Sequence, residues 1–138
     1  MSGAPPHRHP VRVYYEDTDL AGIVYYANYL KFLERGRTEA LRNAGVDQGR
    51  LREERGIVFA VRRVAIEYLR PARLDDLLTV TTAVTWLRGA SVEMRQGILR
   101  GDVTLVTADV TVAAMTLSGR PARLSPELRA VLTSLPTG

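Results

Sequence analysis

The sequence predicts a single α+β domain, with an antiparallel sheet curled around one long helix. An early segment of the 138-residue chain places apolar residues at helical spacing. The later part is rich in Val, Thr and Ile, and Gly or Pro turns interrupt it at strand-length intervals. With 46% hydrophobic residues and no linker between domains, the chain is long enough for one hydrophobic core.

The chain begins with a segment that predicts no regular structure. Residues 1–9 are rich in Pro and small residues, so we expect a disordered tail ahead of a single domain over residues 10–138. A first strand follows, because Val11, Val13 and Tyr15 occupy alternate positions.

One long helix is predicted between Tyr26 and Ala44, where apolar residues recur at helical spacing. Gly45 then provides a stop, since glycine commonly ends helices. Gly36 lies near the middle of this helix, where glycine costs about 1 kcal/mol relative to alanine. A glycine at this position indicates that something packs closely on the helix.

The rest of the chain predicts strands and turns, after a linking segment near residues 47–55. Four antiparallel strands are expected from their Val, Ile, Thr and aromatic content: Ile57 to Tyr68, Leu77 to Trp86, Ser91 to Leu99 and Val103 to Met115. Trp86 is expected on the same face as Val84. Ser125 and Pro126 have the pattern of an N-cap and first helical turn, which predicts a short terminal helix.

Composition excludes several classes of function. The chain has no cysteine, which rules out disulfides, thiol catalysis and cysteine-based metal sites. Its formal charge is +4, but the arginines are scattered and the longest run is the pair Arg62–Arg63, so we expect no nucleic-acid partner. No apolar run approaches the ~20 residues of a transmembrane helix, and the N-terminus lacks a signal-peptide pattern. We therefore expect a cytoplasmic protein without a metal or a cofactor.

The segment from Tyr15 to Tyr29 carries the strongest chemical pattern. It has the pattern of a strand that breaks into a turn and continues as a helix, with Asp19 in the break and Gly22 just ahead of the helix. A helix N-terminus has unpaired N–H groups and a partial positive charge, so it polarises a carbonyl oxygen held there. A carboxylate a few residues earlier can attack the carbonyl carbon or activate water. Acyl transfer needs both groups.

Several blocks of the sequence are similar to one family. They are Val11–Asp19, Gly22–Tyr26, Phe32–Leu41, and Ile66–Pro71 followed by Asp75–Asp76. In this order and spacing the chain resembles the hotdog-fold thioesterases, specifically the 4-hydroxybenzoyl-CoA thioesterase group and its Tol–Pal-associated acyl-CoA thioesterase branch. The resemblance covers most of the chain. It implies a hotdog fold, in which a five-stranded antiparallel sheet wraps the long helix, and cofactor-free hydrolysis of an acyl-CoA thioester.

The resemblance also implies roles for individual residues. Asp19 stands at the family's catalytic aspartate, and the backbone N–H of Tyr26 stands at the donor that holds the thioester oxygen. Asp19 acts either as a nucleophile or as a general base for water, and the sequence leaves both open. Many members of the branch have a histidine where this chain has Tyr26. Substrate-binding roles are predicted for Tyr15, Thr18, Gly22, Val24, Tyr25, Arg88 and Ser91.

Neighbouring residues have structural interpretations beside functional ones. Glu16 and Asp17 are expected to be solvated carboxylates at the end of the first strand, with Asp17 the second candidate for the base. Asn28 is expected to make local hydrogen bonds near the helix start. The side chain of Tyr26 is expected to face the core, while Arg88 is a candidate for the CoA phosphates, which suit guanidinium groups.

The active protein is expected to be an oligomer. The resemblance implies homodimers, often paired as homotetramers, with active sites shared between subunits, and pairing would close an exposed edge strand.

Two other functions stay open: a dehydratase or hydratase acting on the same thioesters, which would need a histidine, and a non-catalytic protein that binds acyl-CoA or acyl-carrier protein. The Tol–Pal-associated branch suggests an aliphatic acyl group and a link to envelope or phospholipid metabolism.

Overall fold

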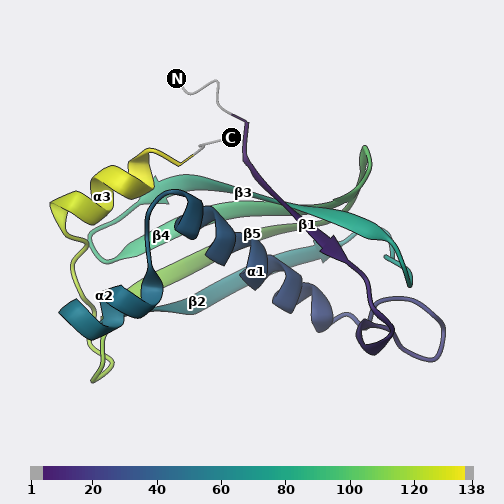
Figure 1. Ribbon diagram of the computed structural model, residues 1–138, viewed down its shortest axis with the longest axis horizontal. Helices are drawn as coiled ribbons and strands as arrows, with labels where there is room; N and C mark the ends of the chain where they lie inside the picture. The colour runs from purple at the N-terminus through teal and green to yellow at the C-terminus, as the bar shows by residue number, and fades with distance from the viewer. Residues whose placement is uncertain (1–4, 136–138) are drawn as a thin grey trace.

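The computed structural model describes residues 5–135 and contains one antiparallel sheet against which a long helix packs (Figure 1). The strands follow the order β1-β3-β4-β5-β2 across the sheet, and each neighbouring pair is antiparallel. Their bounds are β1 His7–Arg12, β2 Ile57–Tyr68, β3 Leu77–Leu87, β4 Ser91–Arg100 and β5 Val103–Thr116. The predicted α+β class, the five-stranded sheet and the four later strands are confirmed.

Helix α1, Asn28–Asn43, buries one side against the sheet. Phe32 and Leu33 are completely buried there, beside Val80 of β3 and Ile98 of β4. Gly36 lets the helix approach the sheet, because a Cβ at this position would overlap the side chain of Val80. The close packing predicted from this glycine is therefore confirmed.

The helix does not cover the sheet evenly. It packs mainly over β1 and β3, with a smaller contact to β4. On β2, at the far edge of the sheet, Phe59, Val64 and Ile66 contact the core but stay only partly buried. A single chain therefore leaves apolar surface beside an open edge strand.

Two shorter helices complete the described chain. Helix α3, Pro126–Thr133, is the predicted terminal helix, and the side chain of Ser125 caps it by accepting a hydrogen bond from the Leu128 N–H. Helix α2, Gln48–Arg55, occupies most of the segment near 47–55 that was predicted as a link, so that prediction is wrong. No helix in residues 5–135 is long and apolar enough to cross a membrane.

Three local predictions also need correction. Strand β1 begins at His7, so residues 7–9 belong to the sheet and not to a disordered tail, while residues 1–4 lie outside the described chain. The long helix begins at Asn28, after Tyr26. Trp86 is 60% exposed, because a register shift between Val84 and Trp86 interrupts the alternation of faces along β3.

Candidate active site

The chain between β1 and α1 folds into two consecutive turns that present Asp19. A short 3-10 turn, Tyr15–Asp17, comes first. In the second turn the Gly22 N–H donates to the Asp19 carbonyl at 3.1 Å, and the Asp19 N–H donates to the carbonyl of Ile23 at 2.9 Å. Gly22 has a φ of 77°, a left-handed conformation that favours glycine. The turn predicted around Asp19 and Gly22 is therefore present.

The carboxylate of Asp19 is exposed and only partly engaged. Its Oδ1 accepts a hydrogen bond from the Ala21 N–H at 2.8 Å, which closes an Asx turn. Among residues 5–135, no hydrogen bond reaches its Oδ2. One carboxylate oxygen is thus held by the turn, while the other is open to a substrate or a water molecule.

Tyr26 lies just ahead of α1, where backbone N–H groups lack intrahelical partners. The Tyr25 N–H donates to the carbonyl of Asp17 at 2.9 Å, and the Asn28 N–H donates to the carbonyl of Tyr25 at 2.8 Å. Between them, the N–H groups of Tyr26 and Ala27 donate to no backbone carbonyl of the described chain. These two donors lie at the positive end of the helix dipole and are suited to hold a carbonyl oxygen.

The side chain of Tyr26 points away from the core and is 61% exposed, so the expected core-facing orientation is wrong. Its ring lies 5.0 Å from that of Tyr25 and 6.2 Å from that of Tyr68, measured between centroids. Tyr68 comes from β2 and was not predicted as a site residue. Burial raises the pKa of the Tyr68 hydroxyl, with a further contribution from Tyr26, so at neutral pH it stays a neutral phenol.

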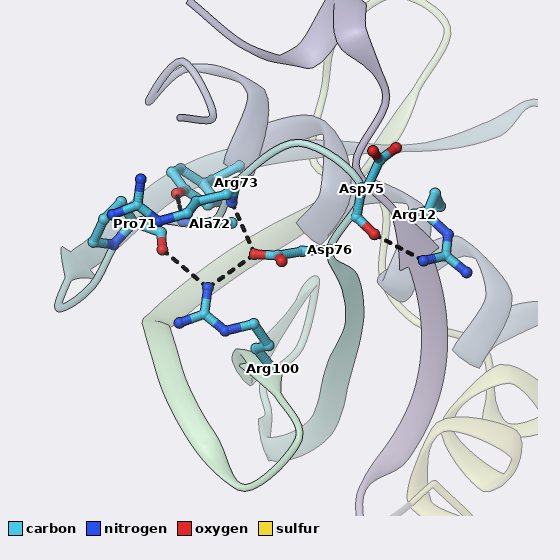
Figure 2. A network of polar contacts seen from close by, with 8 residues as sticks. Arg12, Pro71, Ala72, Arg73, Asp75, Asp76 and Arg100 are labelled. Atoms are coloured by element: carbon cyan, nitrogen blue, oxygen red, sulfur yellow. Dashed lines mark hydrogen bonds and ion pairs between the residues drawn. The ribbon is translucent and has the colours of Figure 1, made fainter. Parts of the chain in front are cut away.

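The loop from Pro71 to Asp76, whose polar contacts Figure 2 shows, is hydrogen-bonded to this segment. The carbonyl of Ala72 accepts a hydrogen bond from the Val24 N–H at 2.9 Å, while the Ala72 N–H donates to the hydroxyl of the buried Tyr29 at 2.9 Å. Ala72 therefore ties the chain just before Tyr26 to the first turn of α1. The blocks Ile66–Pro71 and Asp75–Asp76 stand out in the sequence, but the contacts of Ala72 join residues too distant along the chain for a sequence pattern to reveal.

Asp76 and Arg100 hold the loop in place. The Arg100 Nη1 donates to Asp76 Oδ2 at 2.8 Å, and the same oxygen accepts the Arg73 N–H at 2.9 Å (Figure 2). Burial by itself would raise the pKa of Asp76, but the hydrogen bonds from Arg73 and Arg100 and their positive charges outweigh it and lower the pKa. On the other side, the Arg12 Nη1 donates to the carbonyl of Asp75 at 2.8 Å, which joins the loop to β1 (Figure 2).

The other predicted residues of the turn differ in exposure. Tyr15 is 82% exposed and Tyr25 about half exposed, so both side chains are accessible beside Asp19. Thr18 donates its hydroxyl to the carbonyl of Tyr15 at 2.8 Å. Val24 is buried in the core, where it packs beneath the turn.

Arg88 and Ser91 lie at the other end of the molecule. They follow β3, whose 11 residues begin beside the Pro71–Asp76 loop, and strands of this length place their ends roughly 30 Å apart. Ser91 is buried, and the Arg88 Nε donates to a carboxylate oxygen of Glu93 at 2.6 Å. One chain therefore does not bring these two residues to Asp19, and contact with CoA from another subunit stays a prediction.

A cavity of about 150 Å³ lies farther along α1. Its walls come from α1, α2, β2, β4, β5 and α3, and they mix apolar side chains such as Phe59, Met94 and Leu132 with polar ones. Arg37 also lines it and donates to the amide oxygen of the buried Gln96 at 3.0 Å. Residues 5–135 contain no cluster of three or more His, Asp or Glu side chains placed to bind a metal ion.

Comparison with known proteins places the chain in a family. The profile of the family described as the thioesterase superfamily matches residues 21–107. The acyl-CoA thioesterase YbgC of Haemophilus influenzae is 44% identical over 127 residues, which is 91% of this chain and 93% of that protein. The acyl-CoA thioester hydrolase YbgC of Escherichia coli O157:H7 is 48% identical over 78% of this chain and 81% of that protein.

The fold is likewise similar to solved structures. The crystal structure of a probable thioesterase from Bartonella henselae superposes with a TM-score of 0.83 at 43% sequence identity. The match covers 87% of this chain and 99% of that one.

Proposed function

Because this chain belongs to the thioesterase superfamily, with the hotdog fold, we propose that it hydrolyses acyl-CoA thioesters to a free acid and coenzyme A. The chain is an enzyme, a thioester hydrolase, and its YbgC relatives are named for acyl-CoA substrates. One observation supports the proposal for the site: an exposed Asp19 carboxylate belongs to the same segment as the N–H groups of Tyr26 and Ala27, which donate to no backbone carbonyl of residues 5–135.

In this mechanism the thioester carbonyl oxygen accepts a hydrogen bond from the Tyr26 N–H. The helix dipole and the N–H together stabilise the negative charge that develops on this oxygen, and removal of one such donor typically costs about 10²–10³ in rate. A backbone donor does not depend on the identity of the side chain, which is why Tyr26 can stand where many relatives of the branch have a histidine.

Asp19 supplies the other half of the chemistry, by one of two routes. As a nucleophile, its free Oδ2 attacks the carbonyl carbon, the C–S bond breaks, and coenzyme A leaves as a thiolate. Water then hydrolyses the mixed anhydride and restores the carboxylate. As a general base, Asp19 takes a proton from a water molecule that attacks the same carbon, the C–S bond again breaks, and coenzyme A leaves as a thiolate. A thiolate is a good leaving group, so neither route needs a histidine as general acid.

We also propose that the active form is a homodimer or homotetramer with shared sites. The support is the open edge of β2 and the partly buried Phe59, Val64 and Ile66 beside it, since an unpaired edge strand invites association. A second chain would also be the source of any contact between Arg88 or Ser91 and the CoA. Light scattering at micromolar protein should give twice or four times the 15.3 kDa of one chain, and a monomer would contradict the shared site.

Thiol release followed with a disulfide dye tests the reaction. The substrates would run from acetyl-CoA to palmitoyl-CoA, with benzoyl-CoA and 4-hydroxybenzoyl-CoA included, and we expect an aliphatic acyl group to be preferred. Asp19→Asn should lower kcat by about 10²–10⁴, while Glu16→Gln, at an exposed carboxylate in the preceding 3-10 turn, should keep wild-type activity. A folded wild-type protein that binds CoA but turns over none of these substrates would instead indicate the non-catalytic binding protein.

A further inference from the structure

Asp17 is a buried carboxylate in the turn that precedes Asp19. It is only 6% exposed, so the expectation of a solvated carboxylate is wrong. Its Oδ2 accepts a hydrogen bond from the Tyr14 N–H at 2.8 Å, and its Oδ1 accepts one from the side-chain amide of Asn28 at 2.8 Å. A buried carboxylate is tolerated only with such partners. Each of its oxygens accepts a hydrogen bond within the protein, so this buried carboxylate is less accessible to a substrate or a water molecule than the exposed Asp19.

The contact to Asn28 joins two parts of the chain that are 11 residues apart. Asn28 is the first residue of α1 and follows shortly after Tyr26, while Asp17 comes shortly before Asp19. The carbonyl of Asp17 also accepts the Tyr25 N–H at 2.9 Å. The hydrogen bond between Asp17 and Asn28 thus joins the two ends of the segment that carries the Asp19 carboxylate and the Tyr26 N–H.

We propose that Asp17 and Asn28 are positioning residues for the thioesterase reaction, and that their hydrogen bond sets the separation between the Asp19 carboxylate and the Tyr26 N–H. This inference rests on the proposed function. The carbonyl carbon must lie within reach of Asp19 while its oxygen stays on the Tyr26 N–H, so the two groups must keep one separation. A displacement of about 1 Å can cost 10²-fold in rate.

An exchange of the two side chains tests the pair. In Asp17→Asn, one of the two accepting oxygens is replaced by an NH₂ group. That group, a donor, then faces either the Tyr14 N–H or the Asn28 amide, which are also donors. In Asn28→Asp, two carboxylates face each other. In the double variant, the amide at position 17 accepts from Tyr14 through its oxygen and donates to the carboxylate at position 28, which restores the bond with its direction reversed.

We expect each single variant to lower kcat by about 10–10²-fold with little change in KM. The double variant should recover most of this loss, a coupling that only interacting residues show. Glu16→Gln serves as the control for a neutralised carboxylate next to Asp17. If Asp17 were the base, the double variant would stay as inactive as Asp17→Asn. If the pair were merely structural, the single variants would lower the unfolding midpoint and leave kcat of the folded protein unchanged.

Amide hydrogen exchange keeps this test separate from that of the proposed function. Exchange at Tyr25, whose N–H donates to Asp17, should accelerate in both single variants and slow again in the double variant. Wild-type protein without turnover would overturn the proposed function, while this exchange pattern would still report on the pair. Exchange at Tyr25 that is the same in all four proteins would overturn the positioning role itself.

Discussion

Substitution of Gly36 by alanine should destabilise the protein, although alanine is the better helix former. A Cβ at Gly36 would overlap Cγ1 of Val80, and it would lie 3.1 Å from Cβ of Val80 and 3.4 Å from Nε2 of Gln96. Val80 is fully buried. Gln96 is held by its amide, which donates to the carbonyl of Leu33 and the hydroxyl of Thr82 at 2.9 Å each. Neither neighbour can give way without disturbing the core.

Two opposing contributions determine the magnitude. Overpacking of a close-packed core typically costs about 1–3 kcal/mol, and the replacement of glycine by alanine inside a helix returns about 1 kcal/mol. The overlap involves a branched, buried side chain, so we expect the cost near the top of its range and a net loss of about 2 kcal/mol. Gly49 of α2 is the matched control, since the nearest atom to its added Cβ is an oxygen of Asp47 at 3.4 Å.

Urea unfolding measures the stability of both variants, and their midpoints are compared with that of the wild type at a common dependence of the unfolding free energy on urea concentration. Gly49→Ala should be neutral or stabilised by up to about 1 kcal/mol. The double variant Gly36→Ala/Val80→Ala should lose less stability than the sum of the two single variants, because Val80→Ala removes the Cγ1 methyl that the new Cβ at position 36 meets. A Gly36→Ala protein as stable as the wild type, or more so, would refute the argument from close packing.

Two further predictions concern the Pro71–Asp76 loop. Arg100→Ala should cost about 1 kcal/mol at neutral pH, because the pair with Asp76 is partly exposed. The folded-state pKa of Asp76 is lowered, so this stabilisation is present above the ordinary Asp pKa and is lost as the pH falls through the lowered value. The difference in urea midpoint between wild type and variant should shrink below about pH 4, and a difference that is constant from pH 7 to 3 would contradict this assignment. Tyr29→Phe leaves the Ala72 N–H without its acceptor and should cost about 1–3 kcal/mol in the same assay, whereas an unchanged midpoint would show that water replaces the hydroxyl.

The elements that the sequence predicted well are those with a strong local pattern. The α1 helix has a continuous apolar side, and the later strands are rich in β-branched residues between Gly and Pro turns. Helix α2 lacks such a pattern, because none of its residues is buried and its sequence contains no run of apolar residues at helical spacing. Its ends are nevertheless ordinary: Asp47 caps the start by accepting the Arg50 N–H, and Gly56 ends it in a left-handed conformation.

The candidate site was predictable where it is contiguous in the sequence and not where it depends on tertiary contacts. The turn at Asp19 and the N–H groups at Tyr26 and Ala27 belong to one segment, so the sequence pattern alone could single out this segment. The burial of Asp17 depends on how the turn folds against Asn28, and the position of Tyr68 depends on where β2 lies in the sheet. The role of Arg88 stays a prediction, since a residue type suited to phosphate carries no information about its distance from Asp19 within one chain.

The open donor at Tyr26 follows from how its neighbours are bonded. The Val24 N–H donates to the carbonyl of Ala72, and the Tyr25 N–H donates to that of Asp17. The Asn28 N–H donates to the carbonyl of Tyr25. Each of these bonds fixes the backbone direction on either side of Tyr26, while the start of the helix denies Tyr26 and Ala27 an intrahelical acceptor. The donors are therefore unpaired and rigidly held at once, which is the condition under which a hydrogen bond stabilises a developing charge without reorganisation. Ala72 and Asp17 accept the hydrogen bonds that hold this segment in place. Loss of either hydrogen bond should therefore lower kcat without any change at Asp19 or Tyr26.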